Sequence, residues 1–117
     1  MAQQKIHIDM TDEGGYKVLK PDGDLDVYTV GSLRDSLGSI VEEDSPKVVV
    51  DLDSVPFMDS SGLGALMGGV RRLREAGGDL AIACTREQHL KLFTITGFGE
   101  GVSIAPTVEE AAAGFKS

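Results

Sequence analysis

The feature that most restricts the fold of this chain is a strand pattern followed closely by a helix pattern. Residues 48–52, of sequence VVVDL, are a short run rich in β-branched residues, which is typical of a buried strand. Apolar residues then recur at helical spacing from a start near residue 60, at Leu63, Leu66, Met67, Val70 and Leu73. A short strand that leads into an amphipathic helix predicts a βα unit, the building block of a parallel sheet.

The segment that enters this helix comprises residues 57–64, of sequence FMDSSGLG. It places the Asp59 carboxylate and two serine hydroxyls where the helix has free amides and the positive end of its dipole. Gly62 and Gly64 have no side chains, so another backbone or a bulky group can approach them closely. Asp and Ser are also ordinary helix N-caps, and simple capping explains their presence without any function. The segment by itself leaves both interpretations open.

The composition limits the partners and the chemistry that the chain can support. Its 117 residues suit one domain, which we expect to span residues 1–117. A net charge of −8 disfavours nucleic acid and anionic membranes as partners. Cys84 is the only cysteine, which excludes an internal disulfide and a cysteine-based metal cluster. The first residues contain no apolar segment of signal or membrane-spanning length, so we expect a cytoplasmic protein.

The beginning of the chain predicts a hairpin. Residues 5–10 alternate polar and apolar side chains, and residues 16–19 follow a turn that contains two glycines. Pro21 cannot donate to a strand ladder, so the second strand should be interrupted or lie at an edge there. Residues 23–26, of sequence GDLD, then form a tight acidic corner.

Further strands and helices follow in alternation. A helix with Thr29 as its cap precedes the buried strand, and another short strand covers residues 80–84. We expect Thr85 and Gln88 to form a capping box, and a second box to open the last helix at residues 106–110. This order predicts an α/β fold with a mixed, mostly parallel sheet of four or five strands and about four helices. Loops at the carboxyl ends of parallel strands carry the site in such folds, and the segment before residue 60 lies on that edge.

Ordinary catalysis has little support in the sequence. Residues 59–62, of sequence DSSG, are not the Gly-x-Ser-x-Gly elbow of a serine hydrolase, and the candidate bases are His7 and His89. We expect both histidines on the surface, one facing outward on the first strand and the other on a surface helix. Cys84 ends a strand and is expected to be a small core residue rather than a redox sensor.

Sites for nucleotides and metals also lack their usual patterns. Gly62 and Gly64 lie inside the helix with no lysine after them, so they are a weak match to a phosphate-binding loop. The aspartates do not have the spacing of a calcium loop; they are Asp24, Asp26, Asp51, Asp53 and Asp59. We therefore expect no cofactor and no metal, while a surface serine that another enzyme modifies remains an open alternative.

Four segments match the pattern of a known family. They are residues 23–26 (GDLD), 48–52 (VVVDL), 57–64 (FMDSSGLG) and 92–97 (LFTITG). On these segments the chain resembles the anti-anti-sigma factors, the STAS-domain antagonists of bacterial anti-sigma factor kinases. The resemblance extends from about the second strand to the last helix and implies a STAS-like fold. Residues 20–22 (KPD) depart from the family pattern, in which the second strand usually continues toward the glycine.

The resemblance implies a switchable binding protein that is not an enzyme. The unmodified protein would bind an anti-sigma factor with serine kinase activity and so release a sigma factor. The kinase would phosphorylate Ser60 and end this binding, and a phosphatase acting on Ser60 would restore it. The residues implied in partner binding are Asp24, Asp26, Asp59, Ser60, Ser61, Gly62, Leu63 and Gly64.

Two other functions stay open on the sequence. One is a STAS-type module that binds a partner or senses a ligand without being phosphorylated. The other is a small enzyme that uses Asp59 and Ser60. Spacing also does not rank Ser60 above Ser61, which lies one residue deeper and about 100° further around the helix. We expect Ser60 to be the phosphorylated residue on the resemblance alone.

Overall fold

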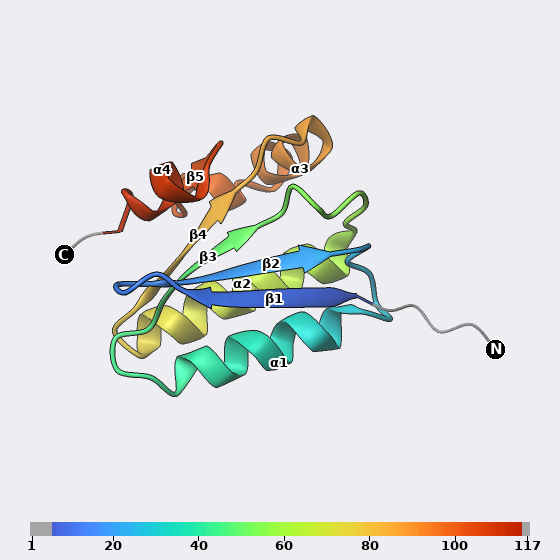
Figure 1. Cartoon of the computed structure of the whole chain (residues 1–117). Helices are drawn as coiled ribbons and strands as arrows, with labels where there is room; N and C mark the ends of the chain where they lie inside the picture. Colours follow the sequence, from blue (N-terminus) through green and yellow to red (C-terminus); the bar gives the residue numbers. More distant parts are fainter. Residues whose placement is uncertain (1–5, 116–117) are drawn as a thin grey trace.

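The computed structural model describes residues 6–115. The bounds of its elements are β1 (His7–Asp12), β2 (Lys17–Asp22), α1 (Val30–Val41), β3 (Lys47–Asp51), α2 (Ser60–Glu75), β4 (Asp79–Ala83), α3 (Glu87–Thr96), the 3-10 helix η1 (Phe98–Glu100), β5 (Ile104–Ala105) and α4 (Val108–Ala112). The five strands follow one another in the sheet in chain order (Figure 1). β1 is antiparallel to β2, and the other neighbouring strands are parallel. The predicted α/β fold with a mixed, mostly parallel sheet is confirmed.

Both faces of the central strand β3 are covered. Val48 and Val50 belong to the larger core, formed with α1 and α2, whereas Val49 packs with Ala111 of α4 in a smaller core. Figure 1 shows α1 and α2 running along the sheet together, with α4 near β5. A strand that is covered on both faces needs apolar side chains in both directions, which explains its continuous apolar sequence.

Helix α2 buries the apolar stripe that its sequence predicts, with one exception. Leu63 and Leu73 lie in the larger core, but Met67, expected in the same stripe, is 53% exposed. Helices α1 and α2 approach each other closely near Gly69. A Cβ atom at Gly69 would lie 2.8 Å from Leu37 Cδ1, so a side chain there would displace the Leu37 side chain.

Strand β2 continues through Pro21. The proline pairs with Ile8 of β1, while the ladder between β2 and β3 has already ended at Leu19. The predicted interruption is therefore wrong, and the edge-like position is right, since Pro21 faces no strand on its β3 side.

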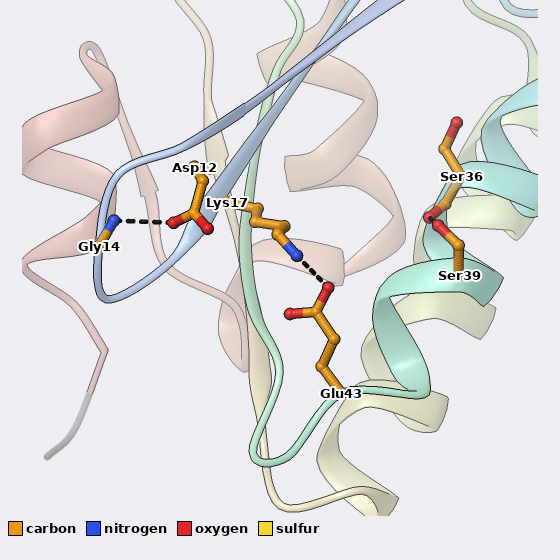
Figure 2. A network of polar contacts seen from close by, with 6 residues as sticks. All are labelled: Asp12, Gly14, Lys17, Ser36, Ser39 and Glu43. Atoms are coloured by element: carbon orange, nitrogen blue, oxygen red, sulfur yellow. Dashed lines mark hydrogen bonds and ion pairs between the residues drawn. The ribbon is translucent and has the colours of Figure 1, made fainter.

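The turn of the hairpin is held to the end of α1. The Asp12 carboxylate accepts a hydrogen bond of 2.9 Å from the Gly14 amide, and Lys17 forms an ion pair with Glu43 just beyond α1 (Figure 2). Gly14 has a φ of 93°, a conformation that favours glycine. The Lys17–Glu43 ion pair therefore holds the hairpin to the end of α1, at the end of the sheet opposite to the carboxyl ends of β3 and β4.

The predicted end of α3 and the predicted start of α4 are confirmed. Gly97 ends α3 in the left-handed region, with a φ of 76°. At α4 the Thr107 hydroxyl accepts a hydrogen bond of 3.1 Å from the Glu110 amide, as a capping box requires.

The capping box predicted for Thr85 and Gln88 is wrong. Helix α3 begins at Glu87, and the residue at its N-cap position is Arg86, whose side chain makes no capping hydrogen bond. The Thr85 amide instead donates a hydrogen bond of 2.7 Å to the Asp53 carboxylate. The local sequence pattern failed here because Asp53, far away in the sequence, binds the predicted capping residue.

The prediction for His89 is also wrong. Its side chain is buried, and its Nε2 atom lies 2.6 Å from the carbonyl oxygen of Val55. The loop that precedes α2 covers this side of α3, which no helical pattern in the sequence reveals. His7 is exposed and Cys84 is buried, both as expected.

The Cys84 thiol is expected to react slowly in the folded protein. Burial raises its pKa, and the nearby carboxylates of Asp53 and Asp51 raise it further. A raised pKa leaves less of the reactive thiolate at about pH 8. Labelling with a thiol reagent such as DTNB should therefore be slow in buffer and fast in guanidinium chloride. Fast labelling of the folded protein would contradict the buried position of this thiol.

Candidate functional site

The acidic corner and the segment before α2 form one backbone unit at the carboxyl edge of the sheet. Leu25 and Met58 pair in a short parallel bridge. The Leu25 amide donates a hydrogen bond of 2.9 Å to the Phe57 carbonyl, and the Asp59 amide donates one of 3.2 Å to the Leu25 carbonyl. Two motifs that are distant in the sequence therefore lie side by side. We call this region, with Asp24, Asp26, Asp59 and Ser60, the acidic edge.

Asp59 is the N-cap of α2. One of its carboxylate oxygens accepts a hydrogen bond of 2.8 Å from the Ser61 amide, and its carbonyl accepts one of 3.2 Å from Leu63. Ser60 is the first residue of α2 and is exposed, whereas Ser61 is half-buried. The capping function thus belongs to Asp59, and the Ser60 side chain lies at the surface at the positive end of the helix dipole.

Asp26 opens the turn that leads into α1. Its carboxylate accepts hydrogen bonds of 2.9 Å from the Tyr28 amide and 3.2 Å from the Thr29 amide. In return, the Thr29 hydroxyl accepts one of 3.0 Å from the Asp26 amide and donates one of 2.7 Å to the Asp24 carbonyl. Asp26 and Thr29 thus exchange side-chain to backbone hydrogen bonds, which fix the turn that precedes α1. Thr29 stands at the N-cap position of α1, as the sequence predicts, but its side chain makes no capping hydrogen bond to the helix.

The two glycines of the motif have different surroundings. A Cβ atom at Gly62 would lie 2.6 Å from Met58 Cγ and 3.1 Å from Leu25 Cβ, so Gly62 lets α2 pack against the backbone unit. Gly64 is exposed and has open space where a side chain would be. Gly62 and Leu63 are therefore buried where α2 packs against the rest of the fold. At Gly64 the backbone of α2 is exposed without a side chain.

Large apolar side chains flank the acidic edge, and the sequence analysis missed them. Tyr28 is 79% exposed and Val27 is 65% exposed, both in the turn that Asp26 opens. Phe57 is 51% exposed in the segment that pairs with Leu25. Exposed apolar side chains beside charged ones are typical of protein–protein contact surfaces. Their position in turns directly next to the two acidic motifs was the signal in the sequence.

Nearly the whole chain matches the sequence model of one protein family. The sequence model of the STAS domain family matches residues 7–111. The chain belongs to the STAS-domain family. A curated relative of this STAS domain is the protein called anti-sigma-B factor antagonist from Staphylococcus aureus. It is 33% identical over 92 residues, which cover 79% of this chain and 85% of the relative.

Solved structures superpose on nearly the whole chain. An anti-sigma factor antagonist from Mycobacterium paratuberculosis superposes with a TM-score of 0.77 at 27% identity, over 92% of each chain. The Bacillus cell fate determinant SpoIIAA, in its phosphorylated form, superposes with a TM-score of 0.68 at 25% identity, over 92% of this chain and 96% of SpoIIAA.

Two structural findings bear on other kinds of site. Within residues 6–115, no three histidine, cysteine, aspartate or glutamate side chains come together as a possible metal site. In the same part of the chain, no helix has the length and apolar character that crossing a membrane requires.

Alanine substitutions at Gly62 and Gly64 should distinguish a glycine that the packing of the fold requires from one that only shapes the surface. Gly62→Ala should lower the free energy of unfolding by about 1–3 kcal/mol, because the added methyl group overpacks the contact with Met58 and Leu25. Gly64→Ala should leave stability unchanged or raise it by about 0.5–1 kcal/mol, since its methyl group meets no atom and alanine favours the helix. Urea unfolding of both variants measures this, and equal effects would contradict the packing described for Gly62.

Proposed function

We propose that this STAS domain is an anti-sigma factor antagonist that binds a kinase-type anti-sigma factor and so releases a sigma factor. The observation that carries the proposal is the acidic edge, where an exposed serine begins a helix between two acidic motifs and beside exposed apolar side chains. The relative from Staphylococcus aureus, called anti-sigma-B factor antagonist, supports the same conclusion at 33% identity.

The protein would act as a substrate of the kinase and not as an enzyme. In this proposal the anti-sigma factor transfers phosphate to Ser60, and a phosphatase removes it in the cytoplasm. Three features support Ser60 over Ser61: its exposed position, its place as the first residue of α2, and the family resemblance. SpoIIAA, a neighbour of the same fold at 25% identity, exists in a phosphorylated form.

Phosphorylation would act on binding and leave the fold intact. A phosphoserine adds about −1.5 to −2 charges at pH 7. At Ser60 these charges would lie at the N-terminus of α2, where the helix dipole favours them. They would also lie next to Asp59 on an edge that is already acidic. A partner surface that fits the unmodified edge would then have to desolvate a dianion, so binding would weaken.

The partner surface that fits this edge is basic and contains an apolar depression. Asp24, Asp26 and Asp59 give the edge a negative potential, although the carboxylates of Asp26 and Asp59 also accept hydrogen bonds from nearby backbone amides. Tyr28 and Phe57 offer large apolar areas beside this charge. Aromatic side chains of this kind often dominate the affinity of an interface, while the surrounding charges steer association.

Substitution of the two serines tests the phosphorylation site. Ser60→Ala should abolish labelling by the cognate anti-sigma kinase with radiolabelled ATP, and the variant should remain a constitutive binder. Ser61→Ala, a matched control one residue away, should keep labelling because Ser61 is half-buried, whereas Ser60 is exposed. Labelling that is lost only in Ser61→Ala would move the site to Ser61. No labelling of the unmodified protein by any anti-sigma kinase would contradict the phosphorylation switch.

Substitution of the exposed aromatic residues tests the contact surface. Tyr28→Ala and Phe57→Ala should each weaken binding of the anti-sigma factor by about tenfold or more, since about 1.4 kcal/mol is enough for that. Ile95→Ala is a control with a comparable exposed apolar side chain, 75% exposed on α3, and should change affinity little. Isothermal titration with folded variants measures the effect. Normal affinity in both aromatic variants would show that the partner binds elsewhere.

A further inference from the structure

The loop between β3 and α2 is held from two sides before it reaches Ser60. On one side the acidic corner holds it: the Gly23 amide donates a hydrogen bond of 3.2 Å to the Ser54 carbonyl, and Leu25 pairs with Phe57. On the other side lies the junction between β4 and α3. The hydrogen bonds on this second side involve side chains and are not part of a helix or a strand ladder. They take no part in the capping of α2 or in the proposed contact surface.

Asp53 makes the first contact with this junction. Its carboxylate accepts a hydrogen bond of 2.7 Å from the Thr85 amide and one of 3.2 Å from the Thr85 hydroxyl. The Asp53 carbonyl accepts a further hydrogen bond of 2.9 Å from Arg86 Nε. Thr85 and Arg86 immediately precede α3, so the helix start and the loop are joined at this point.

His89 makes the second contact, and it is buried. Only 2% of its surface is exposed, and Nε2 lies 2.6 Å from the Val55 carbonyl oxygen. A carbonyl oxygen only accepts hydrogen bonds, so Nε2 carries the hydrogen and donates. This donor is present in the neutral Nε2–H tautomer and in the charged ring alike. Val55 is itself buried and lies between the two ends of the loop.

The fold of α3 alone does not require a histidine at this place. A buried position of a short helix is normally filled by an apolar side chain, as Phe93 fills the next buried position of α3. A buried imidazole is costly unless it is hydrogen-bonded, and here its bond is directed at one backbone carbonyl of the loop. The bond therefore fixes the loop in a way that an apolar side chain of similar size does not.

We propose that His89 is a positioning residue for Ser60, which it holds in place through the Val55 carbonyl. The inference rests on the proposed function, since it concerns how the serine is presented to a kinase. A short stretch of loop separates Val55 from the Asp59 cap. This stretch also makes hydrogen bonds to the acidic corner. Because the loop is bound on both sides, Asp59 and Ser60 occupy one defined position at the start of α2.

The proposal has a consequence for phosphate transfer. In that reaction Ser60 Oγ forms a bond to the γ-phosphorus of ATP held by the kinase, while the bond from this phosphorus to ADP breaks. The serine proton passes to a base of the kinase. The rate of such a transfer depends on positioning, and a misplacement of about 1 Å can cost about a hundredfold. A looser loop should therefore slow the transfer.

Three variants separate positioning from general stability. His89→Leu fills much of the same space but cannot donate to Val55. His89→Gln keeps an N–H donor at a similar distance from the backbone and should rescue the contact. Phe93→Leu is the matched control, because it disturbs an equally buried position of α3 that makes no hydrogen bond to the loop. Each protein is studied as the full chain at the same interval below its own melting temperature.

Two measurements are made on each variant. The first is hydrogen exchange of the amides of residues 53–61, which needs no partner. The second is kcat/KM for transfer of phosphate from ATP by the anti-sigma kinase that labels the unmodified protein. His89→Leu should speed exchange in the loop and lower kcat/KM by about tenfold or more. His89→Gln and Phe93→Leu should stay within about threefold of the unmodified protein in kcat/KM.

The outcomes distinguish this inference from the proposed function. Loop exchange that is unchanged in His89→Leu, or that increases equally in Phe93→Leu, would overturn the positioning of the loop by His89. A loss of transfer that is equal in His89→Leu and His89→Gln would also overturn it, since the donor would then not matter. If no kinase labels the unmodified protein, the proposed function fails, and the exchange measurement alone decides whether His89 positions the loop.

Discussion

The site depends on the pair of backbone hydrogen bonds that Leu25 makes with Phe57 and Asp59. They join two segments that are far apart in the sequence and fix the direction in which the chain enters α2. The side chain of Leu25 is fully buried, and Gly62 packs against it because it has no Cβ atom. A change at any of these residues would therefore move the acidic corner and the start of α2 together, and with them the position of Ser60.

The acidic residues of this edge have two physical functions at once. Asp59 accepts a hydrogen bond from an amide in the first turn of α2, and Asp26 accepts two from amides in the turn that leads into α1. The same carboxylates also contribute to the acidic character of this edge of the molecule. The sequence could not distinguish a structural from a binding function for these aspartates, because the carboxylates that bind backbone amides also lie on the acidic edge. Ser60 therefore lies where the dipole of α2 favours an added negative charge but the neighbouring carboxylate of Asp59 repels it.

Periodicity and turn residues were sufficient to predict the fold, because they report local geometry. The buried run at residues 48–52, the glycine end of α3 and the capping box at Thr107 were all found in this way. The errors at Thr85 and His89 have one common physical cause. Both side chains bind the loop before α2, which is more than thirty residues away in the sequence, and such a contact overrides the local preference of α3. The site residues named from the motif stay a prediction. The exposed apolar side chains beside them and the contacts that anchor the loop required the tertiary structure.

The exposed glycine of α2 adds a last argument about the surface. A glycine within a helix costs about 0.5–1 kcal/mol relative to alanine. At Gly62 the close packing of Met58 and Leu25 offsets this cost, but at Gly64 a side chain would meet open space, so the isolated fold gains nothing. Ser60, Gly64 and the exposed Met67 follow one another on the solvent side of α2. A partner that lies along this side could approach the helix backbone at Gly64 while it contacts Ser60, and a phosphate on Ser60 would then stand directly in its path. Packing within this chain therefore does not account for the cost of the glycine.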